Sequence, residues 1–334
     1  MNLVNCITTI DSHTAGMPTR MVVAGIPTIP GSSLEEKRQY VADLMGDSIG
    51  ILIDEPRGHR AMRGAILTSP TRKEAQVAVI FIGGGCMPSC GHSTIGVITT
   101  ILETGVIKPL EPVTEVVLET PAGLVHTKAA VRDGKVESVS FVNVPAFAYK
   151  SNVDIHVPGM KPLTVDIAFG GNFNILVNSM DIGVEIRPEN TSIFIEKAAL
   201  IKQFINERCR VVHPEKPFIN HATHVQFFAP PLNPQANMRN ITICPPGMVD
   251  RSPCGTGTCA RMANLYSKGE LRLGDKFVHE SVIGTLFQGR ITGETKVGKY
   301  PGIIPEITGS AFITGIHQFV VDPLDPLKYG FVLG

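Results

Sequence analysis

An internal repeat is the feature that most constrains how this chain folds. The segment CGHST at 90–94 recurs as CGTGT at 254–258, 164 residues later. Each copy opens an apolar stretch with helical spacing, at 95–102 and 259–266, and a glycine follows 15 residues after each cysteine. A glycine commonly ends a helix, and repeated segments of this kind share one supersecondary plan. The repeat therefore predicts two halves, each with a helix that begins after its cysteine.

The similarity of the two halves continues on both sides of these helices. Downstream, ETPAGLVHTKAAV at 119–131 resembles ESVIGTLFQGRI at 280–291. Upstream, IDSHTAG at 10–16 and IAFGGN at 167–172 stand in comparable places. We therefore predict a duplicated protein with two domains.

The length and composition of the chain agree with two domains. Its 334 residues suggest two domains at roughly 150 residues each, and 43% hydrophobic residues are ample for two buried cores. The N-terminal half is predicted to comprise residues 1–130 plus 308–334 and to carry Cys90. The C-terminal half is predicted to comprise residues 131–307 and to carry Cys254.

Short runs rich in β-branched residues dominate the chain, and each predicts a strand. These runs are 20–26, 77–82, 115–119, 136–144, 222–228, 240–244 and 311–321. Helical patterns are fewer. The clearest are 33–45, where Ser33 and Glu36 predict a capping box, and 192–207. Because the strands follow one another without a helix in each crossover, we predict a mixed α+β fold with mostly antiparallel pairing.

The charge balance argues against two classes of partner. Thirty Lys and Arg residues and thirty Asp and Glu residues give a formal net charge of zero and a pI near 7.1. No excess positive field therefore attracts nucleic acid or an anionic membrane surface. The apolar runs are far shorter than the ~18 residues that span a bilayer, and the first residues lack a secretion signal. We expect no nucleic acid partner, no membrane partner and a cytoplasmic location.

Seven cysteines are scattered through the chain, unlike the dense even sets that cross-link small secreted domains. They are therefore expected to be thiols. A thiol just before a helix lies where unpaired backbone N–H groups and the helix dipole favour negative charge, which lowers the thiol pKa. Cys90 and Cys254 both occupy that place. The glycine after each cysteine lets backbone N–H groups approach a ligand carboxylate. The residues that would bind the carboxylate are Gly91, His92, Gly255 and Thr256.

Two reactive thiols on opposite sides of one bound molecule can invert a carbon acid. One thiolate removes a proton from one face, and the other thiol returns a proton to the opposite face. This chemistry requires no metal and no organic cofactor. A single cysteine before a glycine is more often an inert core thiol, but the matched pair favours a function. Zinc bound by Cys86, Cys90 and His92 is an alternative, although a fourth ligand and the usual close-paired spacing are missing.

At these residues the chain resembles the proline racemase superfamily, which includes hydroxyproline 2-epimerases and trans-3-hydroxyproline dehydratases. Six motifs carry the resemblance: IDSHTAGMPTR at 10–20, EPRGH at 55–59, SCGHSTIG at 89–96, FGGNF at 169–173, DRSPCGTGT at 250–258 and SVIGTLFQGR at 281–290. The resemblance implies a fold like that of diaminopimelate epimerase, with two pseudo-symmetric domains. Each would be a curved, mostly antiparallel sheet around a central helix, with the active site in the cleft. It also implies a homodimer that needs no cofactor.

The resemblance implies a role for each matching residue. Cys90 and Cys254 match the family's catalytic pair, and the four residues around them match its carboxylate-binding positions. Asp250 matches an acidic residue that holds the ring nitrogen of the substrate, and a carboxylate is a sensible charge-assisted partner for a secondary ammonium. The dehydratases typically have threonine in place of the second cysteine. Cys254 therefore favours inversion over loss of water.

Three further positions bear on the substrate. Proline racemases resemble one another in carrying phenylalanine at the positions of Arg63 and Cys244, which closes the pocket over an unsubstituted ring. Cys244 and His224 instead resemble the residues of hydroxyproline epimerases. A polar side chain there would pair with a ring hydroxyl whose burial unpaired costs about 1–3 kcal/mol. Arg63 matches neither group, since the epimerases usually have a small apolar residue. It either shapes the pocket or lies at the surface or in an ion pair.

These residues predict a cofactor-independent epimerase that converts trans-4-hydroxy-L-proline to cis-4-hydroxy-D-proline. Proline racemase activity on the same residues is the first alternative, and dehydration of trans-3-hydroxy-L-proline is the second. An imino-acid-binding or zinc-binding protein without turnover is the alternative outside enzymes. For the enzymes, the expected partner is a small imino acid, either 4-hydroxyproline or proline.

Overall fold

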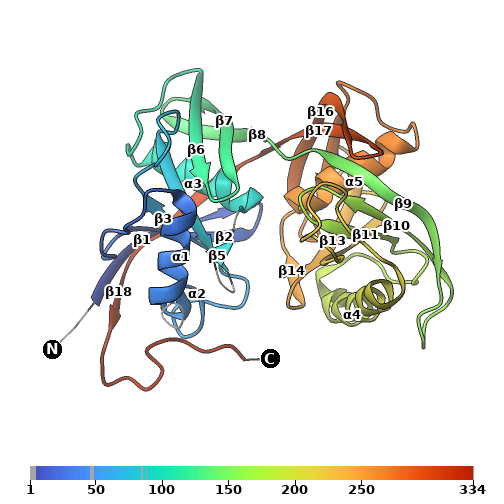
Figure 1. Ribbon diagram of the computed structural model, residues 1–334, viewed down its shortest axis with the longest axis horizontal. Helices are drawn as coiled ribbons and strands as arrows, with labels where there is room; N and C mark the ends of the chain where they lie inside the picture. The colour runs from blue at the N-terminus through green and yellow to red at the C-terminus, as the bar shows by residue number, and fades with distance from the viewer. Residues whose placement is uncertain (1–4, 46–48, 84–85, 88, 334) are drawn as a thin grey trace. The chain divides into compact units, whose positions relative to one another are not determined.

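β-Branched and aromatic residues recur in short runs along the chain, and these runs form strands, as their propensity favours. The structure, a computed structural model, describes residues 5–45, 49–83, 86–87 and 89–333. Within those residues the fold is mixed α and β, with many strands and few helices, as the sequence predicts (Figure 1). The chain divides into two units: unit 1 is Met1–Phe141 with Gly309–Gly334, and unit 2 is Val142–Thr308.

Unit 1 contains most of the N-terminal elements and the last strand. Its elements are β1 (Asn5–Thr14), β2 (Met17–Ala24), α1 (Leu34–Met45), α2 (Gly50–Ile53), β3 (Gly64–Thr68), β4 (Val77–Ile82), β5 (Cys86–Met87), α3 (Gly91–Glu103), β6 (Val113–Thr120), β7 (Gly123–Arg132), β8 (Lys135–Val142) and β18 (Ala311–Val321). The last residue of β8 lies just across the division.

The strands of unit 1 pair in the order β18–β1–β2–β3–β4–β6–β7–β8. The β2–β3 and β4–β6 pairs are parallel and the other pairs in this order are antiparallel, while β5 forms a short hairpin with β4. Helix α3 packs against β1, β2 and β18 and is buried from His92 to Leu102. A helix that is buried on every side needs apolar or small residues all round, and α3 has them.

Unit 2 contains the remaining elements. They are β9 (Ala146–Ile155), β10 (Leu163–Phe169), β11 (Phe173–Asn178), the 3₁₀ turn η2 (Pro188–Asn190), α4 (Thr191–Arg208), β12 (His224–Ala229), β13 (Met238–Cys244), β14 (Met248–Asp250), α5 (Gly255–Ser267), β15 (Lys276–Glu280), β16 (Leu286–Val297) and β17 (Tyr300–Gly309). The last residue of β17 lies just across the division.

The strands of unit 2 close on themselves. They pair in the order β9–β10–β11–β12–β13–β15–β16–β17, and β17 pairs with β9 to complete a barrel-like sheet. The β11–β12 and β13–β15 pairs are parallel, and β14 forms a hairpin with β13. Helix α5 packs against β9, β10, β11 and β16 and is buried from Gly257 to Leu265. The order of pairings in unit 2 thus follows that of unit 1.

The two repeated helices end in the same way. After α3, Gly105 has a φ of +77°, and its N–H donates to the carbonyl of Leu102. After α5, Gly269 has a φ of +73°, and its N–H donates to the carbonyl of Tyr266. Glycine adopts this left-handed conformation without the penalty of a Cβ atom, so it ends both helices.

Two glutamates at equivalent strand ends hold equivalent loops. Glu119, at the end of β6, accepts hydrogen bonds from the N–H groups of Thr71 and Arg72 in the β3–β4 loop. Glu280, at the end of β15, accepts from the N–H groups of Leu232 and Asn233 in the β12–β13 loop. These are the glutamates that open the repeated segments ETPAG and ESVIG.

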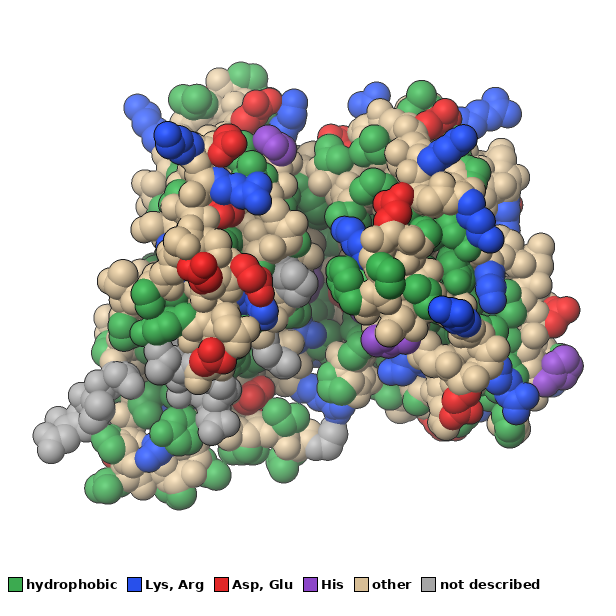
Figure 2. Space-filling view, viewed as in Figure 1, with side chains coloured by type: hydrophobic (Ala, Val, Ile, Leu, Met, Phe, Trp, Pro, Cys, Tyr) green, Lys and Arg blue, Asp and Glu red, His purple; other side chains and the backbone are tan. Residues whose placement is uncertain are grey.

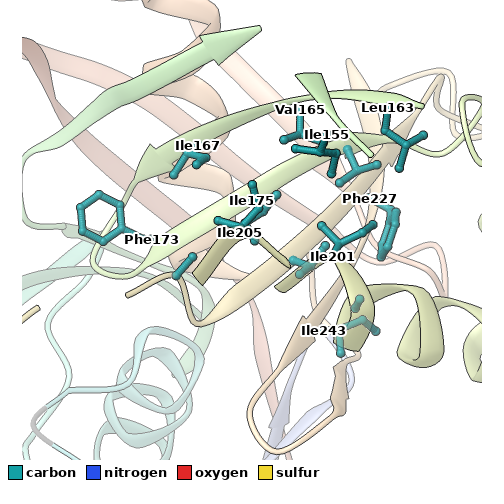
Figure 3. Close-up of a cluster of buried hydrophobic side chains, with 14 of the residues drawn as sticks. Ile155, Leu163, Val165, Ile167, Phe173, Ile175, Ile201, Ile205, Phe227 and Ile243 are labelled. Carbon is teal, nitrogen blue, oxygen red and sulfur yellow. The ribbon is translucent and has the colours of Figure 1, made fainter. Parts of the chain in front are cut away.

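The main core of unit 2 lies between its strands and α4. Ile175 of β11 belongs to this cluster, together with Ile201 and Ile205 of α4 (Figure 3). The next residue, Leu176, points to the other side of β11 and packs with Ala260 of α5. Because α4 covers one face of β11 and α5 the other, the whole run Phe173–Val177 is buried without polar alternation.

Helix α1 starts close to where the sequence predicts. The N–H of Glu36 donates to Ser33 Oγ at 3.2 Å, which is the forward half of the predicted capping box. The Glu36 carboxylate accepts hydrogen bonds from the N–H and Oγ of Ser32, both at 2.8 Å, so its reciprocal partner lies one residue earlier than predicted.

The described residues form no helix long and apolar enough to cross a membrane. On the face seen in Figure 2, basic and acidic side chains are interspersed with apolar ones. This distribution is consistent with the equal numbers of acidic and basic residues in the sequence.

A buried ion pair ties together the first strands of unit 1. Arg20 of β2 donates from Nη2 to Asp11 Oδ2 of β1 at 2.8 Å, and its Nε lies 3.1 Å from both carboxylate oxygens. Its Nη1 donates to the carbonyls of Leu52 and Arg57 at 2.8 and 2.7 Å. Asp11 and Arg20 belong to the motif IDSHTAGMPTR, and these contacts give both residues a structural role.

Replacing Arg20 with methionine is expected to lower the free energy of unfolding by about 3–5 kcal/mol, because it removes the guanidinium that pairs with the buried Asp11 carboxylate. Urea denaturation monitored by circular dichroism measures the change. The matched control is Arg132→Met, which removes an exposed pair with Glu137 and should cost less than about 1 kcal/mol. Equal losses in the two variants would show that burial does not govern the Arg20 pair.

Candidate active site

Cys90 lies immediately before α3, in extended backbone with φ −153° and ψ 113°. Its Sγ donates to Ser93 Oγ at 3.2 Å and lies 3.7 Å from both ring nitrogens of His92. The carbonyl of Cys90 accepts hydrogen bonds from the N–H and Oγ1 of Thr94, both at 2.9 Å. The structure thus brings together three residues that the sequence predicts for the site: Cys90, Gly91 and His92.

The β1–β2 hairpin holds the start of α3. Thr14 Oγ1 donates to the carbonyl of His92 at 2.8 Å, and Thr19 Oγ1 donates to Ser93 Oγ at 3.1 Å. A Cβ atom on Gly96 would lie 3.0 Å from Ser12 Oγ, so the helix approaches the hairpin closely. The motif IDSHTAGMPTR therefore positions the first turn of α3.

The side chain of Arg63 lies across the end of β4, which leads towards Cys90. A Cβ atom on Gly83 would be 2.5 Å from Arg63 Cδ, and Met87 Cε would lie 3.2 Å from the same point. Nη1 of Arg63 donates to the carbonyl of Met62 at 3.1 Å. The backbone carbonyl of Arg63 accepts a hydrogen bond from the N–H of Arg20 at 2.8 Å. Arg63 is half-buried, and it lies beside the hairpin that precedes Cys90.

Cys254 lies immediately before α5 in an unusual backbone conformation, with φ +63° and ψ 111°. L-Amino acids other than Gly rarely adopt positive φ, and such strain is concentrated at functional sites. Cys254 is 4% exposed. Its Sγ accepts a hydrogen bond from the N–H of Gly257 at 3.3 Å. Thr256 Oγ1 lies 3.5 Å from the same sulfur. An N–H aimed at the sulfur stabilises negative charge there.

Asp250 is linked to Cys254 through one serine. Asp250 Oδ1 accepts hydrogen bonds from the N–H and the Oγ of Ser252, at 2.9 and 2.7 Å. Ser252 Oγ in turn accepts from the N–H of Cys254 at 3.2 Å. The carboxylate is buried at the end of β14, directly opposite Thr242 of β13.

His224 and Cys244 lie at the ends of β12 and β13, on the strand faces directed towards the start of α5. Gln226 of β12 faces Thr242 of β13 and donates to its Oγ1 at 3.2 Å. A Cβ atom on Gly257 would lie 2.3 Å from Gln226 Nε2, which places this face against the first turn of α5. His224 and Cys244 are two residues from Gln226 and Thr242, so alternation puts them on the same faces.

The His224 ring is held by its neighbour, since Thr223 Oγ1 lies 2.6 Å from His224 Nδ1. The ring is half-buried, whereas Cys244 is buried. Unit 2 thus brings together six residues that the sequence predicts for the site. They are His224, Cys244, Asp250, Cys254, Gly255 and Thr256.

The FGGNF motif packs the β10–β11 turn against α5. A Cβ atom on Gly170 would be 2.2 Å from the carbonyl oxygen of Thr256, so only glycine fits there. Asn143 Nδ2 donates to the carbonyl of Gly170 at 3.0 Å and lies 3.2 Å from Cys259 Sγ. Burial raises the pKa of the Cys259 thiol to about 12, so this thiol stays protonated near neutral pH.

Three residues that were not predicted from the sequence also contact the two cysteines or their helices: Ser93, Ser252 and Gln226. Ser93 and Gly257 both lie three residues after a cysteine, and that spacing is the one at which a residue before a helix contacts the first turn. This signal was present in the sequence. Gln226 carries no comparable signal, because only the strand register brings it to α5.

In the part of the chain that the structure describes, there is no group of three or more His, Cys, Asp or Glu side chains that could hold a metal ion. Cys86 is half-buried, and burial is the main cause that raises the pKa of its thiol.

His279 and Thr258 support the helix start behind Cys254. Thr258 Oγ1 donates to the carbonyl of Pro253 at 3.2 Å and lies 3.0 Å from His279 Nδ1. His279 is fully buried, and this burial, assisted by the charge of Arg261, lowers the pKa of its ring to about 3. The imidazole is therefore neutral near neutral pH.

Comparisons with known proteins agree on one family. A family model described as proline racemase matches residues 9–332. A proline racemase of Clostridioides difficile is 46% identical over 334 residues, which cover 100% of both proteins. A 4-hydroxyproline 2-epimerase of Streptosporangium roseum is 44% identical over 325 residues, which cover 97% of each. These matches confirm the resemblance that the sequence motifs indicate.

A solved structure gives the same result for the fold. It is a hydroxyproline epimerase from Agrobacterium vitis with bound trans-4-hydroxy-L-proline, and it superposes with a TM-score of 0.88 at 36% identity. The match covers 100% of this chain and 96% of the other.

Replacing His279 with asparagine is expected to change how stability depends on pH. The ring of the unfolded chain protonates near pH 6.5, whereas the folded ring stays neutral down to about pH 3. Stability from the neutral buried ring is therefore complete above pH 6.5 and is lost as the pH falls towards 3. Asparagine does not titrate, so the variant does not lose stability in this way. Its thermal unfolding midpoint should therefore fall less steeply as the pH is lowered, as differential scanning fluorimetry measures.

The control for this experiment is His156→Asn, which replaces an exposed histidine. It should leave the pH dependence of the unfolding midpoint unchanged. Parallel curves for the wild type and His279→Asn would show that His279 is not a buried neutral group.

Proposed function

Because this chain belongs to the proline racemase family and is an isomerase of the racemase and epimerase class, we propose that it inverts Cα of trans-4-hydroxy-L-proline to give cis-4-hydroxy-D-proline. The observation that carries the choice of substrate is the polar end of β12 and β13. His224 and Cys244 there lie on faces directed towards the helix that follows Cys254.

The proposed reaction uses Cys90 and Cys254 as an acid/base pair. The thiolate of one cysteine removes the Cα proton, and the electron pair spreads onto the substrate carboxylate. The thiol of the other cysteine then gives its proton to the opposite face of Cα, which inverts the centre. Each turnover leaves the first cysteine protonated and the second ionised, so the reverse reaction uses the exchanged roles. The chemistry needs no oxidant and no cofactor.

The residues after each cysteine hold the substrate in this proposal. The backbone N–H groups of Gly91, His92, Gly255 and Thr256 bind the substrate carboxylate, since N–H groups at the start of a helix favour an anion. They also stabilise the additional charge that forms when the proton leaves. Asp250 binds the ring ammonium through its buried carboxylate, which is supported by the hydrogen bonds from Ser252.

His224 distinguishes the two substrates in this proposal. A histidine on the edge of the site hydrogen-bonds the ring hydroxyl of 4-hydroxyproline. Proline has no ring hydroxyl, so bound proline does not offer the histidine this hydrogen bond. Proline racemases resemble one another in carrying phenylalanine at the position of Cys244. The smaller cysteine leaves more room beside the substrate ring. The half-buried Arg63, beside the hairpin before Cys90, shapes the pocket in this proposal.

Proline racemase activity is the second candidate. It is favoured by the 46% identity over the full length of the proline racemase of C. difficile. The two activities would use the same acid/base pair, so the substrate profile decides between them.

We further propose that the two units are the pseudo-symmetric halves of a duplicated fold, each of which contributes one cysteine of the acid/base pair. The shared order of strand pairings, the paired glycine caps and the equivalent roles of Glu119 and Glu280 support the duplication. Homodimer formation and a cytoplasmic location stay predictions.

Protection from alkylation tests whether the two thiols share one substrate. Pyrrole-2-carboxylate is planar at the equivalent of Cα and so resembles the transition state. It should protect Cys90 and Cys254 from iodoacetamide with the same half-saturating concentration, as peptide mass spectrometry measures. Protection of one cysteine alone would contradict a shared site.

Cys90→Ser and Cys254→Ser are each expected to lower the rate of inversion by ~10²-fold or more, because each removes one partner of the proton transfer. Proton NMR in D₂O measures the rate as loss of the Cα proton signal of trans-4-hydroxy-L-proline. The control is Cys259→Ser, which changes a buried thiol that stays protonated. Wild-type rates in either of the first two variants would refute the two-thiol mechanism.

His224→Leu is expected to lower kcat/KM for trans-4-hydroxy-L-proline by about tenfold or more, and that for L-proline by much less, because only the first substrate has a hydroxyl to pair. The same NMR assay compares the two substrates. The matched control is His221→Leu, three residues earlier at an exposed position. Equal losses on the two substrates would remove His224 from hydroxyl recognition. A wild-type protein that exchanges the Cα proton of L-proline faster would favour the racemase.

A further inference from the structure

The peptide bond between Pro253 and Cys254 is held by side chains at both of its polar atoms. The Pro253 carbonyl accepts hydrogen bonds from Asn240 Nδ2 at 3.1 Å and from Thr258 Oγ1 at 3.2 Å. The Cys254 N–H donates to Ser252 Oγ at 3.2 Å. This peptide is the one whose orientation determines the φ angle of Cys254, which is +63°. The strained residue thus follows a fixed peptide.

The side chains that fix this peptide belong to a buried network. Thr242 Oγ1 donates to Asn240 Oδ1 at 3.3 Å and accepts from Gln226 Nε2 at 3.2 Å. Thr258 has one hydroxyl proton, which it donates to Pro253, so it accepts a hydrogen bond from Nδ1–H of His279. Asn240, Thr258 and His279 are each 0% exposed. Burial strengthens these hydrogen bonds, because water does not compete for their donors and acceptors.

At the described positions of unit 1 that the strand register relates to Asn240 and His279, the residues are apolar. The parallel pairs Ala78↔Glu119 and Arg239↔Glu280 set the correspondence between the units, since both glutamates hold equivalent loops. By this register, the position of Asn240 is taken by Val79 and the position of His279 by Leu118. Both are apolar and 0% exposed.

The backbone at Cys90 differs in the same sense. Thr94 follows Cys90 at the spacing at which Thr258 follows Cys254, but its Oγ1 donates to the carbonyl of Cys90 itself. Cys90 has an ordinary extended φ of −153°. The polar network and the strained cysteine therefore occur together in one unit and are both absent at the described residues around the other cysteine.

We propose that Asn240, Thr258 and Ser252 are positioning residues that hold Cys254 in its strained conformation and so aim its sulfur at the N–H of Gly257. Loss of the network lets φ relax, which removes the N–H from the sulfur and with it a stabilising contact for the thiolate. This inference rests on the proposed function only in that Cys254 exchanges a proton with the substrate.

The test compares the two cysteines within one sample of the full chain. Thr258→Val keeps the shape of the side chain and removes its hydroxyl. We expect the rate at which iodoacetamide alkylates Cys254 to fall about tenfold or more, the size associated with a hydrogen bond to a charged group. The rate at Cys90, read from its own peptide by mass spectrometry, should change less than about twofold, because the hydrogen bonds of the network all join residues of unit 2. On the substrate, kcat should fall with little change in KM.

Three further variants make the result decisive. Thr258→Ser restores the hydroxyl and should recover the alkylation rate of Cys254. Asn240→Leu removes the other hydrogen bond to the Pro253 carbonyl and should slow the same cysteine. Thr127→Val removes a comparably buried hydroxyl, whose partner is the carbonyl of Val116, and should slow neither.

Equal changes at Cys90 and Cys254, or no change at Cys254, would overturn the positioning role. Failure of the proposed function is distinguishable, since it would appear as full inversion activity in Cys254→Ser, whereas the alkylation ratio reports on the network whether or not the protein turns over a substrate.

Discussion

A helix enclosed by strands is the constraint on which the rest of each unit depends. The first N–H groups of a helix have no partners within the helix, so a buried helix start must obtain partners from elsewhere. In unit 2 the sulfur of Cys254 accepts a hydrogen bond from one of these groups, the N–H of Gly257. In unit 1 the β1–β2 hairpin holds the helix start differently, because Thr14 Oγ1 donates to the carbonyl of His92 and Thr19 Oγ1 donates to the side chain of Ser93. The same unsatisfied N–H groups suit an anionic ligand. The need to satisfy a buried helix start and the ability to bind a carboxylate therefore have one origin.

Much of this arrangement could be predicted from the sequence because it is local. The cysteine, the residues of the helix and the glycine that ends it lie within a continuous stretch, and the positive φ of Gly105 and Gly269 agrees with the predicted helix ends. Strands such as β4 and β18 have the predicted bounds, because their β-branched runs are bounded by turn residues. The contacts made three positions after each cysteine, by the side chain of Ser93 and by the N–H of Gly257, also have a local signal in the sequence.

What could not be predicted depends on strand register. Asn240 contacts the Pro253 carbonyl directly, and His279 contacts Thr258, which donates to the same carbonyl. Asn240 and His279 are 39 residues apart in the sequence, and nothing near either residue indicates these contacts. The positive φ of Cys254 is equally hidden, since cysteine has no preference for it. The contacts of Arg20 could not be predicted for a related reason: its partners come from β1, from Leu52 of α2 and from Arg57 in the segment after α2. The two units thus share their order of strand pairings, whereas the described side chains beneath their cysteines differ.

The pairing of β1 with β18 has a consequence for how the chain folds as it is made. Asn5 pairs with Val321, so β1 can complete its pairing only after β18 has been synthesised. All of unit 2 is synthesised between them and contains within itself the strands that close its barrel. Unit 2 therefore has every pairing partner available before translation ends, whereas one edge of β1 stays open until the last strand leaves the ribosome. An open strand edge is a site for wrong pairing, so the interval between the two strands is when this chain depends most on protection from aggregation.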